Sequence, residues 1–193
     1  CNMKLSERMN EGEFVISNLE NIGYNISFLD EDCIAEGGEF FYLPKENILL
    51  AGQCRNNLIG AEQMAEKLKV SKLYIIPSSG YHLDTSISPI FNSNYDCIGI
   101  ICSGEVFNYE QFLNFSNICH QNNWDIIKVE HSNQIDSIKF RTSMNSLSLP
   151  GLMIGSANLK DKKIIDYTMV NNIILDTTPA SQFNLSGGSV HCL

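Results

Sequence analysis

The feature that most constrains the fold is a repeat that runs through most of the chain. Segments with apolar residues at helical spacing begin near positions 6, 60, 108 and 160. A short run rich in β-branched and aromatic residues follows each of them, at 24–29, 73–77, 125–129 and 172–175. Successive helices and successive strands start roughly 50 residues apart, a period typical of proteins built from several copies of one small unit.

Two further strand-like runs precede each of the last three helices. The first pair, residues 39–43 and 47–51, is joined through Pro44-Lys45-Glu46 and predicts a β-hairpin. The corresponding pairs are 86–91 with 95–102, and 146–149 with 152–155. The repeated unit is therefore strand-strand-helix-strand. Because one such unit cannot bury its apolar face alone, several must pack around a shared centre, and residues 1–193 form a single α/β domain.

Composition excludes several classes of partner. The chain has 13 Lys and Arg against 22 Asp and Glu, a formal net charge of -9. Nucleic-acid binding needs basic residues gathered on one face, so we expect no nucleic-acid partner, whereas a small cationic substrate suits the charge. No run approaches the roughly 20 apolar residues of a membrane span. Seven cysteines without a regular framework or a C-x-x-C pair favour a reducing, cytoplasmic setting and give little support for a metal site.

Side chains capable of chemistry lie at the joins between units. Glu36-Gly37-Gly38-Glu39 follows the first strand, His82-Leu83-Asp84-Thr85 follows the second, and residues 187–192, Gly-Gly-Ser-Val-His-Cys, follow the last. Taken singly, the first is an ordinary turn, the second a surface loop and the third an incidental cysteine near the chain end. If the units surround one centre, however, all three joins face it and their side chains converge.

The convergence would suit one kind of reaction. A thiol such as Cys192 needs a base or a positive neighbour to become a thiolate. An imidazole such as that of His82 carries protons near neutral pH, and carboxylates grip the planar N–H groups of a guanidinium. Together the three joins predict a catalytic thiol that attacks a guanidinium or amidine carbon.

These residues resemble the motifs of the guanidine-modifying, or pentein, superfamily, which includes arginine deiminases, dimethylarginine dimethylaminohydrolases and amidinotransferases. Residues 36–39 are similar to its Glu-Gly-Gly-Asp segment, with Glu39 in the Asp place. Residues 82–84 match its His-x-Asp motif, and 187–192 its terminal Gly-Gly-x-x-x-Cys. Residues 52–57 resemble a Gly-x-Ser-x-Arg-Thr-Asn segment. The resemblance covers nearly the whole chain and implies an α/β propeller of five ββαβ blades around a pseudo-fivefold axis.

The resemblance also implies a role for each residue. Cys192 would be the nucleophile, and His82 would protonate the departing amine and then activate water. Glu36 would orient His82, Asp84 would hydrogen-bond the guanidinium, and Arg55 would bind a substrate carboxylate. The product of such a hydrolase, formed through a covalent amidino-thioether, is a ureido compound such as citrulline. Neither a metal nor an organic cofactor is expected, and the oligomeric state is not readable.

Several alternatives stay open at the level of sequence. The same residues serve an amidinotransferase, in which an amine instead of water resolves the intermediate. A non-catalytic binding module of the same fold is a second alternative, while a cysteine protease lacks any recognisable peptidase signature. The substrate is arginine, a methylated arginine, agmatine or a citrulline-like ureido compound. Asn145 lies where family members often carry an Asn, and we expect a structural role for it.

One departure from the family pattern concerns the N-terminal side. Family members place an Asp, in a Phe-x-x-Asp segment, before the Glu-Gly-Gly, and nothing before Glu36 fits it. The first helix also lacks a preceding pair of strands. We therefore expect a chain trimmed at both ends, with a missing N-terminal blade of order 50 to 80 residues.

Overall fold

Three small sheets carry the fold of the computed structural model, which describes residues 11–77, 81–129, 144–156, 159, 161–180, 182–183 and 188–192. The first contains β1 (Phe40–Leu43), β2 (Ile48–Gly52) and β3 (Lys72–Ile76), with α2 (Leu58–Leu68) between β2 and β3. The second contains β4 (Ile87–Phe91), β5 (Cys97–Ser103) and β6 (Asp125–Val129), with α3 (Tyr109–Gln121) before β6. The third contains β7 (Leu147–Leu149), β8 (Leu152–Ser156) and β9 (Ile174–Thr178), with α5 (Lys162–Val170) before β9.

Every sheet has the same topology. Its first two strands pair antiparallel and its last two pair parallel. A parallel pair needs a long crossover, and the helix of each unit provides it. Asparagine or aspartate side chains cap the three crossover helices at their N-termini, at Asn57, Asn108 and Asp161. The predicted strand-strand-helix-strand unit is confirmed three times.

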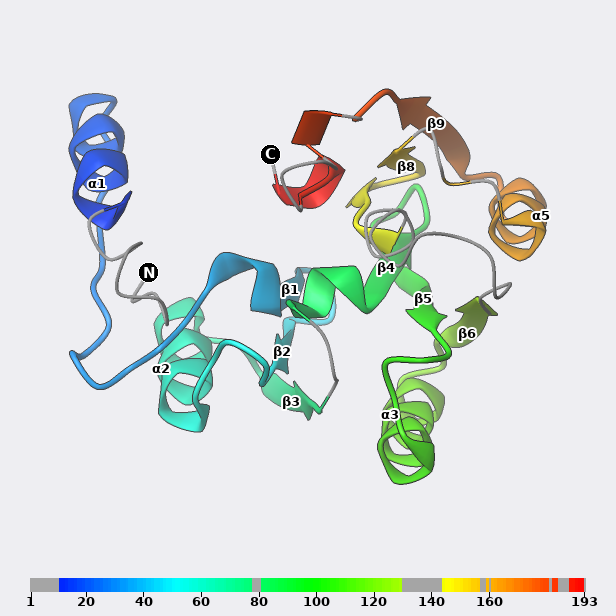
Figure 1. The fold of residues 1–193 in the computed structure, drawn as a ribbon, viewed down its shortest axis with the longest axis horizontal. Coiled ribbons are helices and arrows are strands. Elements are labelled where there is room, and N and C mark those ends of the chain that lie inside the picture. Colours follow the sequence, from blue (N-terminus) through cyan, green and yellow to red (C-terminus); the bar gives the residue numbers. More distant parts are fainter. Residues whose placement is uncertain are drawn as a thin grey trace.

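The three units surround a common region. Figure 1 shows β1, β2 and β4 near the middle of the molecule, with α2, α3 and α5 towards its periphery. The three joins are short 3-10 turns, η2 (Gly37–Glu39), η3 (Leu83–Thr85) and η4 (Val190–Cys192). The first two contact each other, and η4 contacts β8. The arrangement therefore brings the joins of successive units towards one another.

Two apolar clusters hold adjacent sheets together. The first joins the first and second sheets and includes Leu50, Ile76 and Ile100. The second joins the second and third sheets and includes Ile101 and Met153. Because successive side chains of a strand point to opposite faces, the neighbours Ile100 and Ile101 of β5 enter different clusters. The second sheet is thus buried on both faces, and hydroxyl groups add a contact to the third, where Ser88 and Ser146 hydrogen-bond at 2.8 Å.

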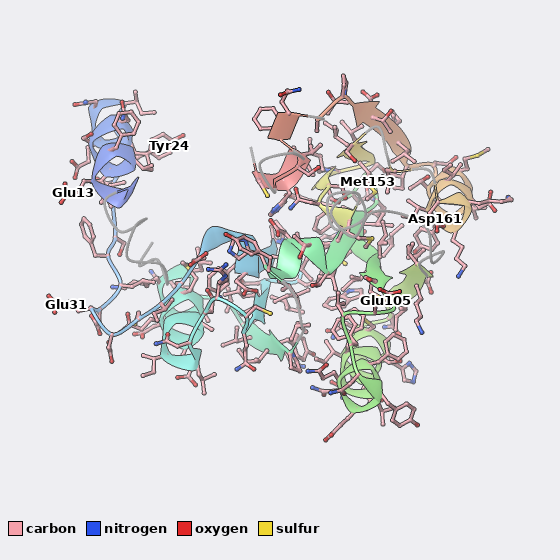
Figure 2. The ribbon with its side chains drawn as sticks, in the orientation of Figure 1. Glu13, Tyr24, Glu31, Glu105, Met153 and Asp161 are labelled. Atoms are coloured by element: carbon pink, nitrogen blue, oxygen red, sulfur yellow. The ribbon has the colours of Figure 1, made fainter. Side chains whose placement is uncertain are left out.

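The N-terminal part departs from the sequence-based expectation. Helix α1 (Glu11–Asn21) is present, while the expected helix start near position 6 lies outside the described residues. The strand predicted at 24–29 is wrong, because these residues form no strand. Tyr24 and Phe28 are more than half exposed, and Figure 2 shows Tyr24 beside α1, away from the sheets. A β-strand is stabilised by a paired neighbour, and no strand of the described residues pairs with this segment.

No helix in the described ranges has both the length and the apolar character needed to cross a membrane.

Candidate active site

A buried acid–imidazole pair links the first two joins. His82 Nε2 lies 2.7 Å from Glu36 Oε2, and the Glu36 and His82 residues are only 1% and 9% exposed. The position of Glu36 is fixed from behind, because its backbone N–H donates to Asn56 Oδ1 at 2.8 Å. The His82 carbonyl accepts the backbone N–H and the hydroxyl of Thr85, which closes the turn that carries the imidazole. A carboxylate in this position fixes the orientation of the imidazole ring.

A second group of contacts surrounds the sulfur of Cys192. Asn145 Nδ2 lies 3.2 Å from Sγ, and Asp84 Oδ2 lies 3.7 Å from it. The neighbouring backbone N–H of His191 donates to Asn145 Oδ1 at 2.7 Å, so that Asn145 clamps η4 through both ends of its amide. The C-terminal thiol is therefore positioned by residues that precede it by 47 and 108 positions.

Gly38 brings the two groups together. An added Cβ at this residue would lie 2.8 Å from His82 Nδ1 and 3.0 Å from Asp84 Oδ2. Both side chains therefore approach the same point beside the backbone of η2, which only a residue without a Cβ leaves open. By contrast, a Cβ at the adjacent Gly37 would meet nothing within 4 Å. The second glycine of the pair is the one that the site requires.

Glu39 connects the joins from the interior. Its Oε1 accepts the backbone N–H of Arg55 at 2.5 Å, and its Oε2 accepts that of Leu83 at 3.0 Å. The residue is fully buried, and this desolvation raises the pKa of its carboxyl group above the ordinary value. A Cβ at Gly52 would lie 1.9 Å from Oε2. Glycine at position 52, the end of β2, therefore leaves the space that the Glu39 carboxylate occupies. Glu39 thus ties η2 to η3 and to the segment after β2.

Arg55 reaches the site through an aromatic ring. Its guanidinium lies 4.2 Å from the centroid of the Tyr81 ring, a cation–π contact. The Tyr81 ring in turn meets the His82 ring edge-on, with centroids 4.5 Å apart. Arg55, in the segment between β2 and α2, is thereby linked to the imidazole through Tyr81, and a role for it in binding a substrate carboxylate stays a prediction.

Two opposing influences act on the Cys192 thiol. Although the residue is exposed, partial desolvation of the sulfur is the larger effect and raises its pKa, and the negative charge of Asp84 raises it further. Hydrogen bonds from the Ser189 backbone and from Asn145 lower it. Since the net shift is upward, the thiol of the ligand-free protein holds its proton more tightly than a free cysteine does. A cation placed beside Sγ would lower the pKa of the thiol and so oppose this shift.

The structure brings together four of the five predicted site residues: Glu36, His82, Asp84 and Cys192. The fifth, Arg55, touches them through Tyr81. The catalytic and binding roles assigned to these residues remain predictions. Sequence reasoning gave Asn145 only a structural role and gave no role to Glu39 or His191. The contacts of Asn145, Glu39 and His191 join residues far apart in the chain. They depend on how the repeated units pack against one another, which no local sequence pattern indicates.

Comparison with known proteins gives matches at the level of structure. No protein-family model and no curated protein matches the sequence. The apo structure of ArgZ, an arginine dihydrolase from the ornithine-ammonia cycle in cyanobacteria, matches with a TM-score of 0.79 and 20% identity. The matched region covers 99% of this chain and 28% of the ArgZ chain. Its N-terminal domain bound to product matches with a TM-score of 0.76 and 18% identity over 97% of this chain and 65% of that one.

A third match is the DDAH from Pseudomonas aeruginosa complexed with citrulline, with a TM-score of 0.67 and 15% identity over 97% of this chain and 66% of that one. The chain has the pentein fold. The expected α/β propeller architecture is thus confirmed, and three ββαβ blades are complete in the described residues. The chain spans less than two thirds of each of these neighbours.

Proposed function

We propose that this protein is a cysteine-dependent hydrolase that acts on the guanidinium group of arginine or a related amidine. The observation that carries the proposal is the meeting of Cys192, Asp84 and the Glu36–His82 pair, which come from three joins of the repeat. A nucleophile, a proton carrier and carboxylates are the groups that such a reaction requires. A fold alone would not call for this combination, since the fold supports proteins of unrelated activity.

The solved neighbours act on or hold compounds of this class. The N-terminal domain of ArgZ has been captured covalently bonded to a reaction intermediate, and a cysteine-to-serine variant of it has been captured with substrate. A cysteine-to-serine variant of the Pseudomonas aeruginosa DDAH holds citrulline. These properties belong to the neighbours. They support a thiol-dependent reaction for this chain because its own thiol lies beside an acid and an imidazole–acid pair.

Binding of the substrate is the step in which Asp84 acts. Its Oδ1 is buried and has no hydrogen-bond partner among the described residues. A buried carboxylate oxygen without a donor is unfavourable, and the N–H groups of a guanidinium would satisfy it. The bound cation would also lie close to Cys192 Sγ and lower the pKa of the thiol, so that the thiolate forms when the substrate is present.

The reaction then proceeds in two halves. The Cys192 thiolate forms a C–S bond to the guanidinium carbon, and His82 donates a proton to the amino group, which leaves as ammonia when its C–N bond breaks. An amidino-thioether remains. His82 next accepts a proton from water, whose oxygen attacks the same carbon. The C–S bond breaks, the thiolate is restored and a ureido product such as citrulline is released. Glu36 stabilises the imidazolium throughout.

Amino-acid substrates carry a carboxylate at the other end. Arg55, fixed by its stack on Tyr81 and by its backbone bond to Glu39, offers the N–H fork that would bind this carboxylate. Arginine and its N-methylated forms have such a group, whereas agmatine lacks it. This pairing favours an amino-acid substrate.

Incubation of the protein with arginine, in the presence and absence of an amine acceptor, tests the proposal. We expect a ureido product and ammonia without the acceptor, and neither product from the matched variant Cys192→Ser. Product formed only with the acceptor would identify an amidinotransferase and contradict hydrolysis. No product under either condition, with the chain folded, would favour a binding module.

A further inference from the structure

His191 directly precedes Cys192 and contacts Asp84, the residue proposed above to bind the substrate guanidinium. Its Nδ1 lies 3.2 Å from Asp84 Oδ2, and its ring centroid lies 5.0 Å from that of Phe41. The backbone N–H of His191 is bound by Asn145. His191 is therefore held at its backbone, by a tilted ring contact with Phe41 and at one ring nitrogen.

The two oxygens of Asp84 differ sharply in their surroundings. Oδ2 is close to both His191 Nδ1 and Cys192 Sγ, whereas Oδ1 is buried and unpaired within the described part of the chain. Gly38 offers no side chain that could hold Oδ2 from the opposite side. The two oxygens are chemically equivalent, so what the contact from His191 fixes is the plane of the carboxylate: one oxygen stays beside the imidazole and the thiol, and the other stays unpaired.

We infer that His191 is a positioning residue that holds the Asp84 carboxylate in place for the substrate. This inference rests on the function proposed above. With its proton on Nδ1, it donates to Asp84 Oδ2 and leaves Oδ1 available for an N–H of the substrate guanidinium. The same bond draws the charge of Oδ2 towards the imidazole and away from the thiolate. Without this donor, the carboxylate is held on the Oδ2 side only by the weaker contact from Cys192 Sγ and is free to turn, so fewer of the protein molecules present a site ready for the cation.

The Nδ1 contact can be separated from other properties of the side chain. Asparagine places an amide nitrogen close to the Nδ1 position of histidine, whereas glutamine places one close to the Nε2 position. His191→Asn therefore keeps a donor for Asp84, and His191→Gln loses it with a similar polarity and size. His191→Phe keeps the ring against Phe41 and removes both nitrogens.

The measurement is the protection of Cys192 by arginine against a haloacetamidine, followed by mass spectrometry of the whole chain. For wild type we record the arginine concentration that halves the labelling rate. We expect this concentration to rise about tenfold in His191→Gln and in His191→Phe, because a hydrogen bond to a charged group is lost. His191→Asn should stay within about threefold of wild type. The thermal midpoints of all variants are compared in parallel.

Equal protection in the Asn and Gln variants would overturn the positioning role, whether both match wild type or both are impaired. If His191→Gln does not fold, the comparison of His191→Asn with His191→Phe decides in the same way. A purely structural role would lower the thermal midpoint without separating the variants by arginine protection. Wild-type labelling no faster than that of a free thiol would refute the proposed function itself, and this inference with it.

Discussion

Asp84 acts on two groups with opposite requirements. Its negative charge attracts a guanidinium, but the same charge disfavours the thiolate of Cys192 at 3.7 Å and raises the pKa of that thiol. A cationic substrate bound at Asp84, as proposed above, would offset the charge of the carboxylate and so remove the conflict. Under the proposed function, we therefore expect activation of the thiol to depend on the bound substrate and reaction with other electrophiles to be slow without it.

Replacement of Asp84 by Asn separates these two effects. With neutral iodoacetamide, we expect labelling of Cys192 in Asp84→Asn to begin at lower pH than in wild type, because the charge that raises the thiol pKa is gone. With a cationic haloacetamidine, the variant should lose saturation by the reagent. Labelling rates over a pH series measure both. Asp96→Asn, which breaks an ion pair with Lys45, serves as the control. If the pH midpoint of iodoacetamide labelling in Asp84→Asn equals or exceeds that of wild type, the Asp84 charge does not raise the pKa of the thiol.

Glu36 is expected to act on the proposed reaction through His82. Glu36→Gln keeps the size of the side chain and removes the charged oxygen that lies 2.7 Å from His82 Nε2. We expect the rate of ureido product formation to fall by about 10- to 100-fold, since a charge-assisted bond is lost. The exposed Glu31→Gln should retain the wild-type rate. A Glu36→Gln variant as fast as wild type would remove Glu36 from the mechanism.

At the scale of the elements, the glycine pair of η2 offers a matched comparison. Gly38→Ala would press a Cβ against His82 and Asp84, whereas Gly37→Ala would extend into open space. We expect Gly38→Ala to reduce product formation at least tenfold and to lower the free energy of unfolding by about 1–3 kcal/mol, and Gly37→Ala to change neither appreciably. Steady-state rates and denaturant titrations measure the two effects. Similar behaviour of the two variants would show that η2 does not hold the site as described.

The elements themselves were largely predictable, and the exceptions have physical causes. The strand at 125–129 and the hairpin through Pro44 follow from apolar patterning and turn chemistry, which are local properties. The segment at 24–29 has the composition of a strand, but composition does not supply a hydrogen-bonding neighbour. The clamp of Asn145 on Cys192 depends on the register between the third sheet and η4, and no local pattern encodes it.

At the scale of the whole molecule, stability comes from clusters shared between sheets. Ile100→Ala and Ile101→Ala each remove a buried side chain, one from each cluster. We expect each to lower the free energy of unfolding by about 2–5 kcal/mol in a single transition, because each cluster joins two sheets. Val15→Ala, on the exposed surface of α1, should have an effect within about 0.5 kcal/mol. Thermal denaturation followed by circular dichroism measures all three, and separate transitions in either isoleucine variant would argue against shared cores.

The architecture as a whole could be predicted because the repeat is visible in the sequence and the motifs fall at its joins. The convergence of Glu36, His82, Asp84 and Cys192 follows from placing those joins around one centre. The fine geometry could not be predicted, since the direction of the Asp84 carboxylate and the contact of Arg55 with Tyr81 depend on packing between units.

The central claim is that Cys192 is a thiol built to attack an amidine carbon, and the most direct test is selective labelling. A haloacetamidine is added to the whole protein, with and without arginine, and each cysteine is followed by mass spectrometry. We predict rapid modification of Cys192 that arginine prevents, while Cys102 and Cys119, whose pKa values burial raises to about 12, react slowly. Modification of Cys192 no faster than that of a free thiol, with no protection by arginine, would contradict the account.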